Sequence, residues 1–243
     1  MNPNYLWKIA TVVLLLSPAG CSFPGERTVA GDGHLVSQSR EIGQFNEVSV
    51  SGSGELSVAQ GSEDALTIEA DENLLPLIQS EVRNGSLRIG PKDVNLRPSK
   101  SIRYELKLKN LNALEVSGSV NGETGALKTE NLALRISGSG RIRVARLDAK
   151  QLSVDISGSG TTAVAGEVKR QEVRISGSGN HQAPELKCSE AAAEISGSGN
   201  ATLLVNDVLM AEISGSGEVE YHGSPQVTRH VSGSGRVRQL DKN

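Results

Sequence analysis

The stretch DISGSGTTAVAGEV, residues 155–168, places the tetrapeptide Ser-Gly-Ser-Gly inside a segment that is otherwise typical of a β-strand. Glycine weakens a strand because it loses more conformational entropy on folding than any other residue. The tetrapeptide nevertheless recurs along the chain, starting at Ser51, Ser137, Ser157, Ser176, Ser196, Ser214 and Ser232, with an imperfect copy, SGSV, at Ser117. So many copies indicate a structural element that the chain uses repeatedly.

The spacing of the copies predicts a stacked repeat. From Ser117 onward, successive copies start 20, 20, 19, 20, 18 and 18 residues apart. A fixed period near 20 residues is typical of solenoids. The 66 residues between Ser51 and Ser117 are close to three further periods without the tetrapeptide. Within them, 72–83 predicts either a strand or a short helical insertion, and Asn84-Gly85 predicts a hairpin turn.

Apolar and polar residues alternate on both sides of each copy. Over 132–144, one parity holds leucine, isoleucine, valine and both glycines, whereas the other holds arginine and both serines. This period of two is the signature of a strand with one buried face. A helix would need a period near 3.6, and each glycine inside it would cost about 1 kcal/mol relative to alanine.

These patterns predict an all-β protein, a parallel β-solenoid with coils of about 20 residues. Each coil has room for two strands of about six residues and two bends. The glycines are expected at the bends, facing the core, where a Cβ atom would collide, and the serines outside, in hydrogen-bonded ladders from coil to coil. The predicted bend residues are Ser51, Gly52, Ser53, Gly54, Gly138, Gly140, Gly158, Gly160, Gly177, Gly179, Gly197, Gly199, Gly215, Gly217, Gly233 and Gly235. Charged residues at 236–243 are expected to cap the C-terminal end.

Residues 1–20 have the pattern of a secretory signal, with one lysine, an apolar run at 9–16 and small residues before Cys21. The apolar run is too short for a stable membrane span. The small residues directly before Cys21 resemble a bacterial lipobox, although Pro18 stands where leucine is usual. This resemblance implies that Cys21 is acylated and anchors the mature protein, in the outer membrane; an ordinary signal peptide with an incidental cysteine is the alternative. We expect a flexible tether over 21–41 and a single domain over 42–243.

Several segments together resemble one protein family. They are FNEVSVSGSGELSVAQG (45–61), LTIEADENLLPLI (66–78), NGSLRI (84–89) and the serial units that end in SGSG. The chain is similar, over about 42–238, to the bacterial envelope proteins with the auto-transporter adhesin head GIN domain. The resemblance implies an all-β, solenoid-like, exported protein that is often a lipoprotein, and it supplies no active-site motif.

Composition and motifs argue against several kinds of site. A net charge of −3 and 2% aromatic residues do not suit nucleic-acid binding. The histidines, His34, His181, His222 and His230, show no metal-ligand spacing, and no nucleophile elbow is predicted because the repeats contain no helix. We expect no catalytic residue, no metal and no cofactor. His181 and Tyr221 are expected in the core or at a bend, Cys188 in the core and His230 on the surface.

The predicted function is therefore non-enzymatic. We expect a cell-envelope protein attached to the membrane through its N-terminal lipid, which acts as an adhesin or interaction module toward a glycan or protein of the envelope or of a host. A periplasmic structural or envelope-stress-associated binding protein is the alternative. A carbohydrate-active enzyme on a β-helix is a further alternative, and it would need carboxylates assembled from different coils. Oligomeric state and the side of the membrane that the protein faces stay open.

Overall fold

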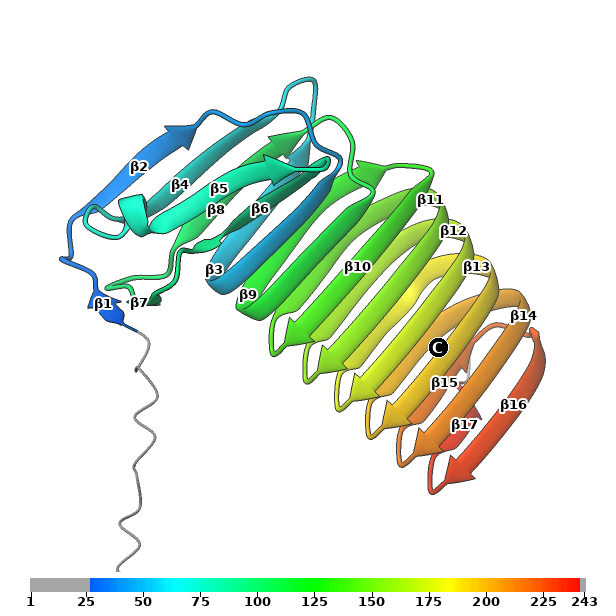
Figure 1. The fold of residues 1–243 in the computed structure, drawn as a ribbon. Helices are drawn as coiled ribbons and strands as arrows, with labels where there is room; N and C mark the ends of the chain where they lie inside the picture. Colours follow the sequence, from blue (N-terminus) through cyan, green and yellow to red (C-terminus); the bar gives the residue numbers. More distant parts are fainter. Residues whose placement is uncertain (1–26, 241–243) are drawn as a thin grey trace, which may run out of the picture.

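The structure, a computed structural model, describes residues 27–240, and almost all of them lie in or between β-strands (Figure 1). The predicted signal sequence and Cys21 lie outside the described residues. Strands pair in parallel from coil to coil, which confirms the predicted parallel β-solenoid. No helix among residues 27–240 is long and apolar enough to cross a membrane.

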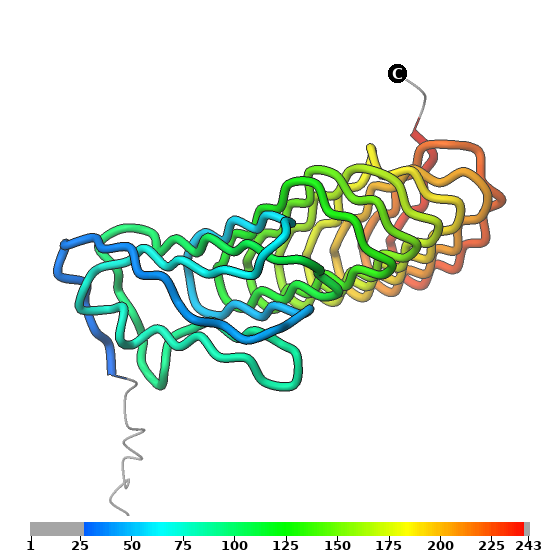
Figure 2. The backbone as a smooth tube through the Cα atoms, turned by 90° about the horizontal axis from the view of Figure 1, so that it is seen from above, coloured from blue at the N-terminus to red at the C-terminus, as the bar shows by residue number. Residues whose placement is uncertain are grey.

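The solenoid body is a row of parallel coils (Figures 1 and 2). Its strands are β9 (Ala113–Lys128), β10 (Asn131–Gly138), β11 (Arg141–Gly158), β12 (Thr161–Gly177), β13 (Asn180–Gly197), β14 (Asn200–Gly215), β15 (Glu218–His222), β16 (Gln226–Gly233) and β17 (Arg236–Gln239). In each coil a first arm, such as Asn131–Gly138, runs into the tetrapeptide, and a second arm, such as 141–148, starts directly after it. The longer strands continue from one second arm into the next first arm, so they exceed the predicted six residues.

The first arms keep one register throughout the body. Ser137 lies opposite Ser157 on the next strand, and the same alignment of serine with serine and glycine with glycine continues to β16. The changes in period are absorbed in the second arms, where the register shifts between Val144 and Leu147 and again between Ala163 and Gly166. The tetrapeptide is therefore the fixed point of every coil.

The core confirms the predicted alternation. Side chains of the apolar parity, such as Leu134, Ile136, Ile142 and Val144, are at most 2% exposed. The arginines of the other parity on these arms face solvent. Stacking coils with this pattern produces one continuous hydrophobic column, in which each coil buries its apolar surface only against its neighbours.

The segment between Ser51 and Ser117 does not form three further stacked coils. Strand β3 (Glu47–Gln60) pairs directly with β9, which places Ser51 opposite Ser117. The intervening chain folds over the N-terminal end as β4 (Ala65–Asp71), a 3-10 turn (Leu75–Leu77), β5 (Ile78–Arg83), β6 (Ser86–Pro91), β7 (Asn95–Arg97) and β8 (Arg103–Leu108). Strands β6 and β8 pair in parallel with the two halves of β3, so this N-terminal cap supplies about one more layer.

Local signals in the N-terminal cap are confirmed. Asn84 and Gly85 both have positive φ, 52° and 78°, and they form the two-residue turn between the antiparallel strands β5 and β6. The ambiguous segment 72–83 contains both predicted elements, since the 3-10 turn beside Pro76 leads directly into β5.

Part of the predicted tether is folded. Within 21–41, β1 (Thr28–Ala30) pairs with β7, and β2 (Leu35–Arg40) pairs with β4 in antiparallel orientation. The sequence reads as a tether because β2 is an edge strand with largely exposed, polar side chains. Its backbone groups nevertheless satisfy the free edge of β4, which would otherwise stay unpaired.

The predicted C-terminal cap is also partly a strand. Arg236–Gln239 forms β17, which pairs with β15 and continues the stack, and 241–243 lie outside the described residues.

Candidate binding surface

The tetrapeptide directs its glycines and serines to opposite sides. Gly138 and Gly158, the first glycines of two successive copies, have φ of +117° and +114°. A Cβ atom on Gly158 would lie 2.6 Å from the carbonyl oxygen of Gly138, which no side chain tolerates. The second glycine, Gly160, is buried, and a Cβ atom there would strike the Ile136 side chain of the preceding coil. The two serines of this copy, Ser157 before the first glycine and Ser159 between the glycines, are both exposed.

Backbone hydrogen bonds join successive bends. The N–H of Ser159 donates to the carbonyl oxygen of Gly138 at 2.9 Å, and the N–H of Thr161 donates to that of Gly140 at 3.0 Å. The same pair of bonds recurs between the later coils. The predicted ladder therefore runs through the backbone and leaves the serine hydroxyls out. Within the described chain, no hydrogen bond is made by the hydroxyls of Ser137, Ser157, Ser176 and Ser196.

A row of alternating charges runs beside these serines, two residues earlier in each first arm. Its members, on neighbouring strands, are Glu115, Arg135, Asp155, Arg174 and Glu194. Arg174 lies 3.9 Å from Asp155 and 3.5 Å from Glu194, and it also contacts Glu172 of its own strand. Arg135 makes no ion pair with another described residue. Exposed pairs of this kind contribute about 0–1 kcal/mol each to stability, so the row is better explained by what it presents to solvent.

The serine row and the charge row line a shallow groove of about 480 Å³ that crosses β9 to β13. We call it the serine groove. Its polar lining residues are Ser137, Ser157, Ser176, Ser196, Glu115, Arg135, Asp155, Arg174 and Glu194. The groove offers a hydroxyl on each of four coils, together with charges of both signs. Such a surface suits an extended, repeating polar ligand more than a compact one, because its contacts recur with the coil.

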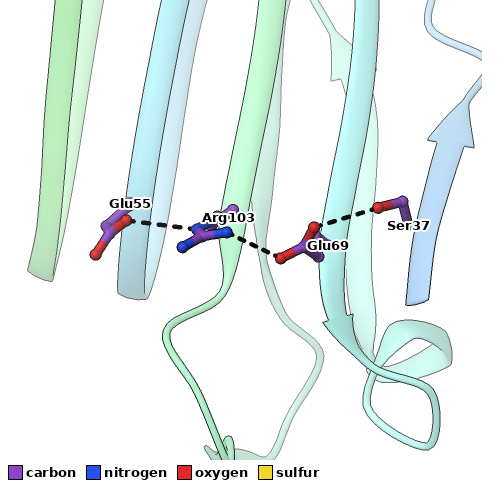
Figure 3. Close-up of polar contacts among 4 residues, drawn as sticks. All are labelled: Ser37, Glu55, Glu69 and Arg103. Carbon is purple, nitrogen blue, oxygen red and sulfur yellow. Dashed lines mark hydrogen bonds and ion pairs between the residues drawn. The ribbon is translucent and has the colours of Figure 1, made fainter. Parts of the chain in front are cut away.

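A second polar row crosses the N-terminal cap (Figure 3). Arg103 of β8 lies between Glu55 of β3, at 3.8 Å, and Glu69 of β4, at 3.2 Å. The hydroxyl of Ser37 on β2 donates to the other oxygen of Glu69 at 3.4 Å. These exposed contacts cross four neighbouring strands of the cap. They continue toward a shallow groove of about 390 Å³ that also involves Arg141 of the solenoid body.

The predicted core residues are placed as follows. His181 is 1% exposed; its Nδ1 lies 2.7 Å from Thr162 Oγ1 and its Nε2 lies 2.5 Å from Gln171 Nε2. The amide nitrogen of Gln171 only donates, so His181 Nε2 accepts and Nδ1 carries the hydrogen. Burial lowers the pKa of His181 to about 3. The imidazole is thus a neutral core group, as expected.

Cys188 is buried as predicted, and its thiol donates to the carbonyl oxygen of Leu204 at 3.3 Å. Burial, and then the charge of Asp207, raise the pKa of this thiol to about 12, which keeps it unreactive at neutral pH. Tyr221 is only partly buried against the core, and His230 is exposed as expected.

One group of potential ligands was not predicted from the sequence. Asp32, His34 and Glu72 present potential metal-ligand atoms that all lie within 4.8 Å of one another. The spacing of residues around His34 gave no indication of this group, and the expectation that the chain binds no metal stays a prediction. The cluster is not visible in the sequence because Glu72 directly follows β4 and is brought beside His34 only by the pairing of β2 with β4.

Comparisons with known proteins agree with this architecture. The family described as "Putative auto-transporter adhesin, head GIN domain" matches residues 44–225. Two crystal structures are each 25% identical and cover 88% of this chain and 100% of their own. One is described as a "putative lipid binding protein" from Parabacteroides distasonis, with a TM-score of 0.74, and the other as a "putative adhesin" from Parabacteroides merdae, with 0.72.

A third crystal structure, from Bacteroides fragilis, is 22% identical and has a TM-score of 0.78 over 87% of this chain and 100% of its own, which shows a shared fold. A comparison with functionally curated proteins found no match. Because the family match covers most of the chain, including the N-terminal cap and most of the solenoid body, the protein belongs to the auto-transporter adhesin, head GIN domain family.

Proposed function

We propose that the protein is an exported, lipid-anchored and non-enzymatic adhesion module of the cell envelope, and that its serine groove binds an extended polar polymer such as a glycan. The observation that carries this proposal is the row of serine hydroxyls that make no hydrogen bond within residues 27–240, flanked by alternating charges. Membership of an adhesin-like family supports it.

Repetition of weak contacts is the physical basis of this binding. One hydrogen bond contributes only about 0.5–1.5 kcal/mol net, so a single serine gives little affinity. A polymer whose units repeat can make the same contact on several coils at once, and the combined affinity then exceeds that of any one contact. With 2% aromatic residues, the chain offers little surface for stacking against sugar rings, so we expect weak binding per unit and strong dependence on ligand length.

The charge row sets the kind of polymer. Arg135 has no ion-pair partner in the described chain, whereas Arg174 is neutralised by the carboxylates around it. The groove therefore offers one free cation among hydroxyls, which favours a neutral or sparsely acidic glycan over a polyanion. The carboxylates Asp155, Glu172 and Glu194 surround Arg174 in ion pairs, an arrangement that supports a surface role for them over catalysis.

The proposed anchor at Cys21 would also limit the distance between the folded domain and the membrane. Six residues lie between Cys21 and the first residue of β1, Thr28, which makes seven steps along the chain. Fully extended, they span at most about 25 Å. An acyl chain on Cys21 would thus hold the N-terminal cap close to the membrane and let the solenoid body project from it.

The location is tested first, by protease shaving and antibody labelling of intact cells, with Cys21→Ala as the control. We expect labelling and cleavage on intact cells, and release of the protein by the substitution. Protection until the outer membrane is opened would overturn the surface adhesin and favour the periplasmic binding protein. Unchanged membrane retention of the Cys21→Ala variant would overturn the lipid anchor.

The groove is tested by binding of the full-length protein to an array of envelope and host glycans. Arg135→Glu reverses the charge of the arginine that has no ion pair in the described part of the serine groove. Arg143→Glu is its matched control, since Arg143 is exposed on the second arm of β11 and also forms no ion pair among the described residues. We expect Arg135→Glu to reduce binding and Arg143→Glu to leave it unchanged. Equal effects of the two substitutions would contradict the proposed site.

A further inference from the structure

We propose that Asp32, His34 and Glu72 form a binding site for one divalent transition metal ion of the zinc class, at the outer end of the N-terminal cap. Asp32 and His34 belong to the turn between β1 and β2, and Glu72 follows β4. Each offers one ligand atom, and these atoms all lie within 4.8 Å of one another. The inference does not rest on the proposed function.

Backbone hydrogen bonds hold the two segments together. The N–H of Glu72 donates to the carbonyl oxygen of His34 at 2.8 Å, and the N–H of His34 donates to Asp32 Oδ1 at 2.9 Å. The side-chain oxygen of Asn73 accepts from the N–H of Asp32 at 3.0 Å, and its amide donates to the carbonyl oxygen of Ala30 at 2.8 Å. The Cα positions of the three ligands are therefore fixed before any ion arrives, which lowers the entropy cost of binding.

A buried carboxylate supports the turn that carries Asp32 and His34. Asp71 is fully buried, and it accepts hydrogen bonds from the N–H of Gly33 at 2.8 Å and from both the N–H and the hydroxyl of Ser99, at 2.9 and 2.5 Å. Gly33 has a φ of +86°, and a Cβ atom on Gly31 would collide with the Asp71 carboxylate. The glycines on either side of Asp32 thus let the turn close tightly over Asp71.

The donor set selects the class of metal. One imidazole and two carboxylates are donor types that zinc accepts, and three protein ligands with water in the fourth position is the ligand number of an open zinc site. Calcium prefers six to eight oxygen ligands, and an imidazole is a poor substitute for one of them. Zinc–ligand distances of about 2.0–2.2 Å require the three donor atoms to move closer together. All three side chains are exposed, so they rotate toward an ion without disturbing the core.

The cluster is also distinctive within the described chain. His222 and His230 belong to no comparable group of three potential ligands there, and His181 is buried in the core. His230 is exposed, which makes His230→Ala the matched control for His34→Ala.

The test is a calorimetric titration of the full-length protein, in detergent, with zinc chloride at neutral pH, repeated with cobalt to follow its visible spectrum. We expect saturation at one ion per chain, and at least tenfold weaker binding in the His34→Ala and Glu72→Gln variants. The cobalt bands should disappear in His34→Ala, because the imidazole nitrogen is then lost. His230→Ala should bind as the wild type does.

Since the substituted side chains are exposed, the variants should melt at the wild-type temperature in the presence of a chelator, which separates loss of binding from loss of folding. The assignment is overturned by the absence of saturable binding, by binding that survives the His34→Ala/Glu72→Gln double substitution, or by displacement of zinc with an equal concentration of calcium.

Discussion

At the scale of single residues, the glycines and the serines of the tetrapeptide have different roles. Gly158 combines a positive φ with a close approach to the backbone of the preceding coil, whereas Ser159 points to solvent and contributes its N–H to the ladder. Any residue supplies that N–H except proline. The glycine is therefore required by the fold, and the serine side chain is available for another role.

This difference predicts the result of two substitutions. Gly158→Val should destabilise the protein by roughly 3 kcal/mol or more, because the side chain meets the carbonyl oxygen of Gly138 and cannot easily adopt the backbone angle. Ser159→Ala should change stability by no more than about 0.5 kcal/mol. Thermal melting followed by circular dichroism checks both. Equal melting temperatures would contradict the structural role assigned to the glycine.

A second residue-scale prediction concerns His181, whose neutral imidazole is part of a buried network. Its pKa is about 3 in the folded protein and about 6.5 in an unfolded chain. Between these values the unfolded state binds one more proton, so stability is complete above pH 6.5 and falls by about 1.4 kcal/mol for each pH unit below it. From pH 6.5 to 5, the expected loss is about 2 kcal/mol.

Denaturant unfolding at pH 7 and pH 5, compared with a His181→Gln variant, measures this contribution. The variant should lose less stability on acidification than the wild type, because its amide does not titrate. An equal loss of stability in both proteins would show that the imidazole of His181 is not the titrating group.

At the scale of elements, the sequence predicts the solenoid body well because every coil repeats the same alternation around the same bend. The parity of 132–144 identifies the buried face, and the constant spacing identifies the stack. Two features override local pattern at the N-terminus. The polar segment Leu35–Arg40 becomes the edge strand β2 because it pairs with β4. Strand β3 pairs directly with β9, although the residues of the inserted cap separate the two strands in the sequence. Both depend on contacts between distant segments, which local pattern does not encode.

The candidate sites differ in the same way. The outward direction of Arg135 and Ser137 follows from parity, so most of the serine groove is visible in the sequence. What the sequence does not show is that the hydroxyls of the groove serines make no hydrogen bond with any described residue, since the coils are joined through backbone groups. The Asp32, His34 and Glu72 cluster is likewise invisible, because it depends on the antiparallel pairing of β2 with β4.

The repeat predicts that one whole coil is dispensable. Deleting 139–158 joins Gly138 to Ser159, which restores an intact tetrapeptide and lets the second arm of β12 stack on that of β9. The shortened protein should keep its β-type circular dichroism and melt cooperatively at a lower temperature, because it has one interface fewer. Deleting 139–148 removes half of the tetrapeptide and the second arm that follows it, keeps the next first arm, and is the control.

We expect the ten-residue deletion to lose ordered β-structure, since the chain can no longer return across the coil. If it folded as well as the twenty-residue deletion, the coil would not be the unit of folding.

At the scale of the whole molecule, the two ends of the solenoid differ. The N-terminal end is covered by the cap, whereas at the other end β16 pairs only with β14 and β17 only with β15 among the described residues. A hollow of about 520 Å³ remains there, lined by Arg229, Val231, Gly235, Arg236, Val237 and Arg238. Unpaired strand edges beside the exposed Val231 would ordinarily promote association with another chain.

Arg229 provides a physical barrier to such association. It lies opposite Ala211, at the inward-facing position that small or branched apolar residues occupy in the preceding coils. A further coil or a second molecule stacked on this end would have to bury the guanidinium without a partner, which is costly. An inward-pointing charge on an edge strand is a recognised way to prevent edge-to-edge pairing.

Arg229→Leu should therefore promote end-to-end association, because it replaces the charge by a side chain that fits the apolar column. Light scattering after size-exclusion chromatography should show a larger mean mass for this variant than for the wild type at the same concentration, increasing with concentration. Arg143→Leu adds the same apolar group on the side of the solenoid body and should leave the mass unchanged. If Arg229→Leu matched the wild type, the charge would not be what ends the stack; if both variants associated, exposed leucine alone would explain the effect.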